Sequence, residues 1–161
     1  MSVNVGDRKL SKIEVLYQAD KLQEEIAALC LRSFGLYSRN SPLRIKYLRA
    51  VKLDDNPEFL MDIMTSKREL LLIWADDVVA SLAAANSIYP RNSEEFSQRL
   101  SYQNNALASC GMIDKELNEI AKVFDVDINA FNQSVKALEY EQHLIKQWRK
   151  SDKARFSRYL L

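Results

Sequence analysis

Glycine and proline are scarce in this chain, with 3 of each among 161 residues. A fold with many strands needs frequent tight turns, which usually contain these two residues, so their scarcity favours a few long helices. Hydrophobic residues make up 47% and charged residues 28% of the chain, and both values are ordinary for a globular protein. A chain of this length can bury a sizeable core as one domain. We therefore expect a single all-α domain.

Long apolar segments are also missing. The longest runs, such as residues 70–75, are far too short to span a bilayer. The first residues lack the apolar stretch of a secretion signal. The sequence thus predicts a cytoplasmic protein with no membrane partner.

Side chains that commonly carry out chemistry are few, because His143 is the only histidine and Cys30 and Cys110 are the only cysteines. A nucleophilic serine or cysteine needs a base within hydrogen-bonding distance, and a single imidazole is available. A metal centre needs three or four converging ligands, and the pairing of Glu139 or Glu141 with His143 does not recur elsewhere. Neither a glycine-rich phosphate loop nor a nucleophile elbow is present. We expect buried cysteines, no catalytic residue, no metal and no cofactor.

Apolar residues recur at alternating spacings of three and four over four segments, which is the pattern of helices that pack together. Candidate N-cap residues precede three of the segments, at Ser11, Asn92 and Asp127. Pro90 ends the second segment, because proline lacks the amide hydrogen that a helix needs. The expected inward positions are Val15, Ala19, Leu22, Ile26, Leu29 and Ser33; Leu71, Ala75, Val78, Leu82, Ala85 and Tyr89; Gln103, Ala106, Cys110, Ile113, Leu117, Ile120 and Phe124; and Phe131, Val135, Leu138, Gln142 and Ile145.

These segments and their short connections predict an antiparallel up-and-down four-helix bundle. We expect a flexible tail at residues 1–10, the bundle domain at residues 11–158 and a C-terminal end at residues 159–161. Residues 39–66 are expected to form a helical insertion between the first two long helices. Within it Pro57 lies in the first turn of a helix, and residues 65–69 either break that helix or continue it.

The net charge is only +1, but its distribution is uneven. Residues 26–53 contain six basic residues and no acid, and residues 143–161 contain six basic residues against a single acid. The second segment interleaves its cations with aromatic residues, and cations neutralise phosphates while aromatic faces stack on unpaired bases. The predicted nucleic-acid-binding residues are Arg149, Lys150, Lys153, Arg155, Arg158, Arg44, Lys46 and Arg49. The alternative is that these cations only solvate helix surfaces and complement a helix dipole.

Two short motifs carry a resemblance to a known family. Residues 85–90 read A-N-S-I-Y-P, and residues 148–152 read W-R-K-S-D. Between them stand the further matching residues Asn92, Glu95, Arg99, Tyr102, Gln103, Ala106 and Cys110. The pairing resembles the Avd-like four-helix-bundle proteins, which are relatives of the accessory variability determinant of diversity-generating retroelements. The resemblance extends over roughly residues 11–38 and 67–158.

The resemblance implies a non-catalytic accessory protein that forms a homo-oligomer, a pentamer in the family, and binds a reverse transcriptase. It also implies binding of template RNA during mutagenic reverse transcription, through Arg149, Lys150 and Lys153 in the matching motif and Arg155 and Arg158 just beyond it. Residues 39–66 exceed the family's usual first connection, so the cations within them have no family counterpart.

Two other functions remain open from the residues. The first is an oligomeric protein-interaction scaffold without a nucleic-acid role. The second, a metal-dependent bundle enzyme, requires bound metal, which the ligand inventory argues against.

Overall fold

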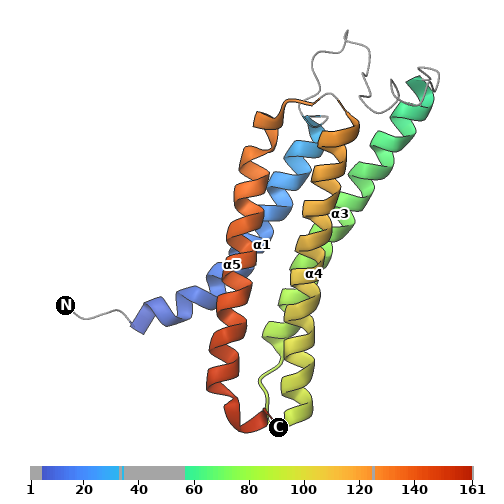
Figure 1. Ribbon diagram of the computed structural model, residues 1–161. Coiled ribbons are helices and arrows are strands. Elements are labelled where there is room, and N and C mark those ends of the chain that lie inside the picture. Colours follow the sequence, from blue (N-terminus) through green and yellow to red (C-terminus); the bar gives the residue numbers. More distant parts are fainter. Residues whose placement is uncertain (1–4, 33, 35–56, 125, 161) are drawn as a thin grey trace.

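The computed structural model describes residues 5–32, 34, 57–124 and 126–160, and these residues are helical apart from short connections. The long helices are α1 (Val5–Leu31), α3 (Pro57–Ser87), α4 (Ser93–Val123) and α5 (Asn132–Arg155), with short 3-10 turns η2 (Ile128–Phe131) and η3 (Ser157–Tyr159) (Figure 1). The expected all-α fold with four long helices is confirmed. Ser33, Arg44, Lys46 and Arg49 lie outside the described residues.

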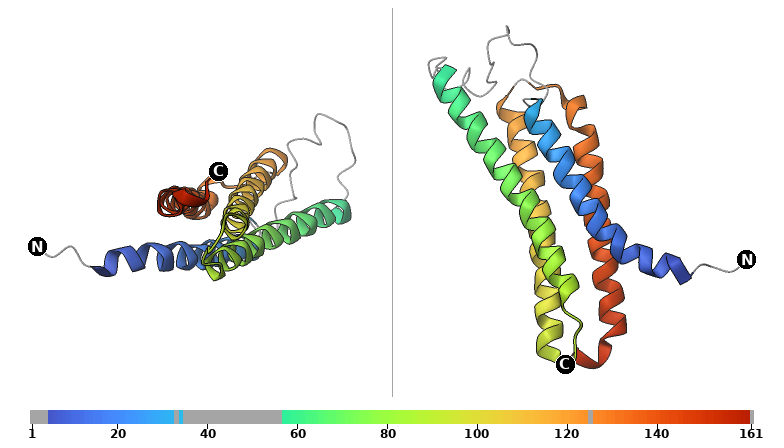
Figure 2. Two further views of the ribbon diagram at one scale, coloured as in Figure 1. Left: turned by 90° about the horizontal axis from the view of Figure 1, so that it is seen from below. Right: turned by 180° about the vertical axis from the view of Figure 1, so that it is seen from behind.

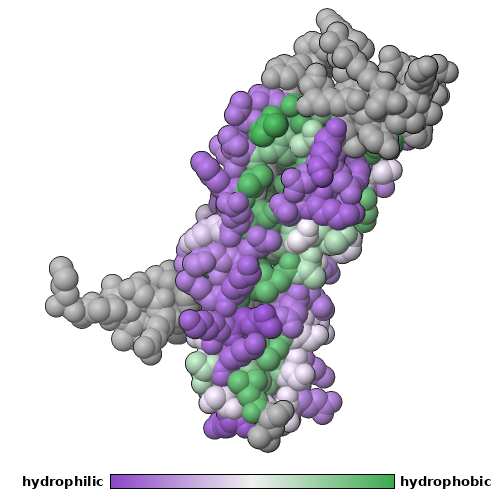
Figure 3. Space-filling view, viewed as in Figure 1, coloured by the Kyte–Doolittle hydropathy of each residue, from purple (hydrophilic) through white to green (hydrophobic). Residues whose placement is uncertain are grey.

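Each long helix packs against two others, since α1 contacts α3 and α5, and α4 contacts the same pair. The contact between α3 and α4 is the most extensive, and the contact between α4 and α5 is the least. The first turns of α1 extend away from the other helices (Figure 2). The face seen in Figure 3 shows a narrow stripe of apolar side chains between hydrophilic flanks.

Two helices are longer than the sequence predicted. Helix α1 begins at Val5, so the expected start behind an N-cap at Ser11 is wrong. No proline interrupts the residues before Ser11, so the sequence allows the helix to begin earlier. Helix α3 runs without a break from Pro57, so residues 65–69 continue it. Residues 57–66 therefore belong to a long helix and not to a separate inserted one.

Among the described residues, the predicted inward positions of the first three helices are buried, with one exception. Tyr89, expected at the end of the α3 stripe, is 61% exposed because α3 ends at Ser87 and the chain turns away from the core. The buried members are Val15, Ala19, Leu22, Ile26 and Leu29 on α1; Leu71, Ala75, Val78, Leu82 and Ala85 on α3; and Gln103, Ala106, Cys110, Ile113, Leu117 and Ile120 on α4, followed by Phe124.

Helix α5 is rotated by one residue from the predicted phase at two positions. Ser134 and Glu141 are fully buried, whereas the predicted Val135 and Gln142 are only half-buried. Adjacent positions both fit a repeat of threes and fours. Hydropathy favours Val135 over Ser134, and the charge of Glu141 favours Gln142 at the inward position. Trp148, which stands seven residues after Glu141 and so on the same face of the helix, is also buried.

Polar residues fix the turns between helices. Asn92 caps α4 as predicted, because its Oδ1 accepts a hydrogen bond from the Glu95 amide at 2.9 Å. Glu95 Oε2 in turn accepts from the Arg91 amide at 2.8 Å. Asp127 accepts from the Asn129 amide at 2.9 Å and so caps the short turn η2 that leads into α5.

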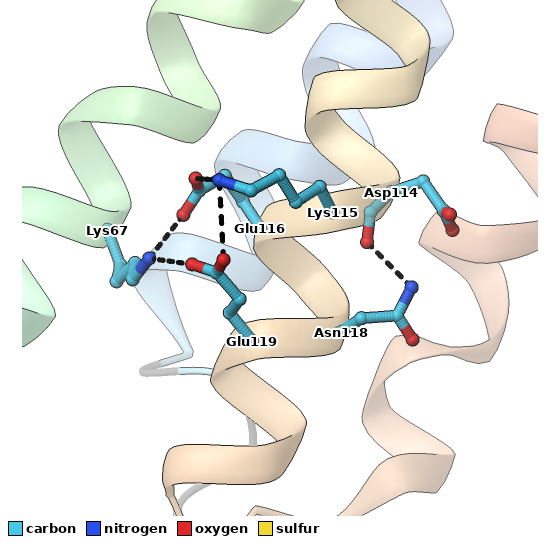
Figure 4. A network of polar contacts seen from close by, with 6 residues as sticks. All are labelled: Lys67, Asp114, Lys115, Glu116, Asn118 and Glu119. Carbon is cyan, nitrogen blue, oxygen red and sulfur yellow. Dashed lines mark hydrogen bonds and ion pairs between the residues drawn. The ribbon is translucent and has the colours of Figure 1, made fainter.

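An ion network joins α3 to α4 (Figure 4). Lys67 Nζ lies 2.6 Å from Glu116 Oε2 and 2.6 Å from Glu119 Oε2, and Lys115 also pairs with Glu119 at 3.3 Å. Partial burial alone lowers the pKa of Lys67, but its hydrogen bonds to the two carboxylates outweigh that effect and raise it. The network satisfies Glu116, which is otherwise buried.

Carboxylates on the middle of α3 also bond to neighbouring helices. Aspartates on a helix are mostly exposed to solvent, and Asp76 and Asp77 stand side by side in the middle of α3. Asp77 accepts a hydrogen bond from Ser109 on α4, and Asp76 accepts one from Gln23 on α1. Both side chains therefore help to position α3.

The segment Asp62–Ser87 of α3 is long and apolar enough to cross a membrane by length and composition. Consecutive apolar runs do not reveal this segment because isolated polar residues interrupt it, and a helix packed in a protein core passes the same test. In the structure its inward positions, Leu71 and Leu82 among them, pack in the shared core.

The first prediction tests this core. Leu82→Ala should lower the free energy of unfolding by about 2–5 kcal/mol, because the removed atoms leave a cavity. Leu72 lies on the same helix and is 39% exposed, so Leu72→Ala is the matched control, with an expected loss below about 1 kcal/mol. Urea denaturation followed by circular dichroism measures both. Equal losses would contradict the assignment of the inward face.

Candidate nucleic-acid interface and the buried ion pair beside it

A buried ion pair lies where α3 ends, α4 begins and α5 ends. Arg99 on α4 and Asp152 on α5 are 1% and 2% exposed. Arg99 Nε donates to Asp152 Oδ2 at 2.7 Å, and its Nη2 donates to Oδ1 at 3.1 Å. This two-pronged geometry is the strongest that a guanidinium and a carboxylate form. Gln103 Nε2 donates a third hydrogen bond to Asp152 Oδ2 at 2.6 Å.

The same guanidinium also binds the end of α3. Arg99 Nη1 donates to the carbonyl oxygens of Ala85 at 3.1 Å and Ile88 at 2.7 Å. Carbonyls at a helix C-terminus have no partner within the helix, and a cation there also complements the helix dipole. The Arg99 guanidinium carbon lies 4.9 Å from the centroid of the Trp148 ring. One side chain therefore ties together three helices.

The two sequence motifs meet at this pair. Ala85 and Ile88 come from the first motif, and Trp148 and Asp152 come from the second. Sequence reasoning treated Arg99 only as part of the resemblance. A signal was available, because Arg99 stands four residues before the inward Gln103 and so falls on the same buried stripe of α4.

The W-R-K-S-D motif is divided between core and surface. Trp148 and Asp152 are buried, whereas Lys150 is exposed and Arg149 is half-buried. Within the described part of the chain, the buried Nε of Arg149 has no hydrogen-bond partner. The structure thus gives the predicted cations of this motif unequal access to a ligand.

Three lysines share the outer face of α5. Lys146, Lys150 and Lys153 are four and three residues apart and are exposed, so they lie in one row about 10 Å long. None of the three forms an ion pair with an acid among the described residues. We call this row the lysine ridge. Sequence reasoning counted Lys146 in the basic segment but did not select it as a binding residue.

Two predicted arginines lie instead at the end of the fold. The Arg155 guanidinium stacks over the rings of Tyr89 at 5.5 Å and Phe156 at 5.3 Å, and that of Arg158 stacks over Tyr159 at 4.9 Å. Phe156 also meets the edge of Tyr89, at 5.8 Å between centroids. We call the group Tyr89, Arg155, Arg158 and Tyr159 the tip. The predicted residues Arg44, Lys46 and Arg49 lie outside the described residues, so the structure does not place them.

A carboxyl group is buried in the middle of α5 without a partner. Glu141 is fully buried, and neither of its oxygens has a hydrogen-bond partner among the described residues. Burial, with a smaller effect from the charge of Asp20 on α1, raises its pKa from 4.5 to about 8. The charge of Glu141 in turn contributes, after burial, to the raised pKa of Cys110 on α4. Glu141 is therefore a neutral acid in the core at pH 7.

The thiols and the imidazole do not form a reactive centre in the described structure. Both cysteines are free and buried, and burial raises the pKa to about 11 for Cys30 and about 12 for Cys110. Such thiols are poor nucleophiles at pH 7. His143 is exposed on α5. In residues 5–32, 34, 57–124 and 126–160, no three histidine, cysteine or acidic side chains gather in a way that could hold a metal ion.

The fold and this end of it define an all-helical protein of four long helices with a buried ion pair beneath a cationic surface. Comparisons with family models, with curated proteins and with solved structures find no match to the chain.

The second prediction concerns the ion pair. Asp152→Asn should lower the free energy of unfolding by about 3–5 kcal/mol, because it leaves the Arg99 charge buried and uncompensated. Arg99→Met should cost a similar amount. The double variant should lose clearly less than the sum of the single variants, and urea denaturation of all four proteins gives this coupling. Additive losses would show that the two side chains do not depend on one another.

The third prediction concerns the pH dependence of stability. The folded-state pKa of Glu141, about 8, lies above the ordinary 4.5, so the folded chain holds its proton more tightly than the unfolded chain. The protonated Glu141 therefore stabilises the folded chain, and this stabilisation is fully present below about pH 4.5. As the pH rises from there toward about 8, the free energy of unfolding falls by about 1.4 kcal/mol per pH unit. Glu141→Gln should remove that slope from urea denaturation curves recorded between about pH 5 and 8. An unchanged slope would assign the dependence to other groups.

Proposed function

We propose that this chain is a non-catalytic accessory protein of a diversity-generating retroelement. In this proposal it binds the reverse transcriptase and the template RNA through basic surfaces of an oligomeric helical bundle in the cytoplasm. It would thereby support mutagenic reverse transcription without a cofactor or metal of its own.

The observation that carries the proposal is the lysine ridge. Its three ammonium groups point to solvent in one row and have no acidic partner among the described residues. Acids three or four residues away along a helix would offset such charges. An unpaired row attracts a polyanion, and neutralising phosphates releases their counterions. Template RNA is the polyanion that the sequence resemblance implies.

The proposal includes an antiparallel up-and-down arrangement of the four helices. Contacts that link α1, α3, α4 and α5 in a closed ring support it, as do the short connections after α3 and α4. The proposal also includes a homo-oligomer, which is a pentamer if the resemblance holds for assembly. Neighbouring subunits and the reverse transcriptase would cover apolar surface such as the stripe in Figure 3.

One observation favours the alternative of an oligomeric protein-interaction scaffold without a nucleic-acid role. Leu72 and Ile73 are 39% and 57% exposed on the middle of α3, a different helix from the one that carries the lysine ridge. Exposed aliphatic neighbours are typical of a surface that another protein covers. The two functions differ in whether removal of the lysine ridge has any effect on nucleic-acid binding.

The fourth prediction tests the lysine ridge. Changing Lys146, Lys150 and Lys153 together to glutamate should weaken binding to a labelled RNA at least about tenfold at low salt. A control with the same change in net charge reverses Lys21, Lys122 and Lys136, which lie on α1, on α4 and at the start of α5. Fluorescence anisotropy gives the affinities, and circular dichroism checks that both variants fold.

Each outcome separates the two functions. The accessory role is supported if the ridge variant binds RNA more weakly than wild type while the control variant does not. Co-purification of the wild-type chain with a co-expressed retroelement reverse transcriptase would support it further. Unchanged RNA affinity in the ridge variant would overturn the nucleic-acid role and leave the scaffold.

A further inference from the structure

We propose that the tip binds unpaired bases, so that the nucleic acid taken by this protein is a single strand whose phosphates follow the lysine ridge. This inference rests on the proposed function and adds to it the form of nucleic acid and the residues that select that form. Proteins that hold single strands combine a cationic track with aromatic side chains on which bases stack. The described surface contains both parts next to each other on α5 and its C-terminal end.

Tyr89 is the main candidate for stacking. It belongs to the connection between α3 and α4, and 61% of its surface is exposed. The ring is nonetheless held in place, because its hydroxyl accepts a hydrogen bond from Arg155 Nη2 at 3.4 Å and it packs against Phe156. An aromatic ring that is exposed and already ordered binds a flat ligand with little loss of conformational entropy.

The arginines of the tip extend this platform. The Arg155 guanidinium stacks on Tyr89, and the Arg158 guanidinium stacks on Tyr159. Guanidinium planes also stack on nucleobases and place a positive charge close to the phosphate of the same nucleotide. The tip therefore offers two paired planes of the kind that hold splayed-out bases.

The lysine ridge leads to this platform. Lys153, the last lysine of the row, stands two residues before Arg155, where α5 ends. The row is about 10 Å long, so it can lie along the phosphates of about two or three consecutive nucleotides. A strand bound along α5 would thus bring its next bases to the tip. A base-paired duplex could contact the lysines but could not offer its bases for stacking.

The buried ion pair explains why the platform holds its shape. The Arg99 guanidinium lies 5.9 Å from the Phe156 ring, beneath the side chain that packs against Tyr89. Phe96 contacts Phe156 and Tyr159 at 5.5 and 6.5 Å between centroids. The exposed rings therefore rest on a packed aromatic floor.

A membrane surface is the other partner that cations and aromatic residues can bind. The observations favour nucleic acid, because most of the aromatic surface beneath the tip is already packed. Among the described residues near the tip, Leu160 is the exposed aliphatic side chain. Membrane-bound surfaces generally present several such side chains together.

The experiment measures binding of the full chain to four probes by fluorescence anisotropy or co-sedimentation. The probes are a 12-nucleotide unstructured RNA, a single-stranded DNA of the same length, a blunt RNA duplex of the same length and phosphatidylserine vesicles. The key variant is Tyr89→Ser, with Tyr89→Phe as the variant that keeps the ring. Tyr17→Ser is the matched control, because Tyr17 is 53% exposed on α1 and has Lys21 stacked over its ring at 5.5 Å.

We expect the wild-type chain to bind the single strands more tightly than the duplex. Tyr89→Ser should weaken single-strand binding about tenfold and leave duplex binding unchanged, whereas Tyr89→Phe and Tyr17→Ser should stay within about twofold of wild type. Equal effects with RNA and DNA single strands also support the inference, because stacking and phosphate contacts are common to both.

Other outcomes overturn the inference in distinguishable ways. If duplex and single strand bind equally and Tyr89→Ser changes neither, the tip is not a stacking site, but the proposed function stands. If vesicles bind and Tyr89→Ser abolishes only that binding, the tip is a membrane contact. If no nucleic acid binds the wild-type chain, the proposed function fails together with the inference.

Discussion

The bidentate pair between Arg99 and Asp152 is the interaction on which this end of the protein depends. A buried guanidinium or carboxylate without a partner is strongly destabilising, so each side chain requires the other. The remaining bonding capacity of Arg99 is directed to carbonyls at the end of α3, and Gln103 donates to Asp152. Helices α3, α4 and α5 therefore cannot separate at this end without exposing or isolating a charge.

That constraint accounts for the position of the surface cations. Asp152 and Trp148 must both face Arg99 in the core. Because a helix has 3.6 residues per turn, Lys150 and Lys153 then point away from the core. One short motif thus supplies both the internal anchor and the external charge. The residues that carry the proposed function are thus held in place by buried neighbours.

Much of the fold was predictable from local patterns. Alternating spacings of three and four identified the inward positions of α1, α3 and α4, and the side chain of Asn92 marked the start of α4. The start of α1 was missed, because a good capping residue at Ser11 does not prevent an earlier helix start. The phase of α5 was missed at Glu141, because hydropathy assigns a carboxyl group to the surface, whereas burial leaves it as a neutral acid.

The candidate site was less predictable, for a physical reason. Arg99 and Asp152 are 53 residues apart, and no local period links them. The sequence grouped the cations of residues 143–161 as one basic segment, whereas the structure divides them between the lysine ridge, the tip and a half-buried Arg149. Only the three-dimensional path of the chain decides which cations share a face.

Amide hydrogen exchange of Asp152→Asn, compared with the wild-type chain under conditions where both are folded, tests the central role of the pair most directly. The account predicts faster exchange confined to the last turn of α3, the first turns of α4 and the end of α5, with the middle of the four helices still protected. Unchanged exchange at these three helix ends, or an equal increase along all four helices, would contradict it.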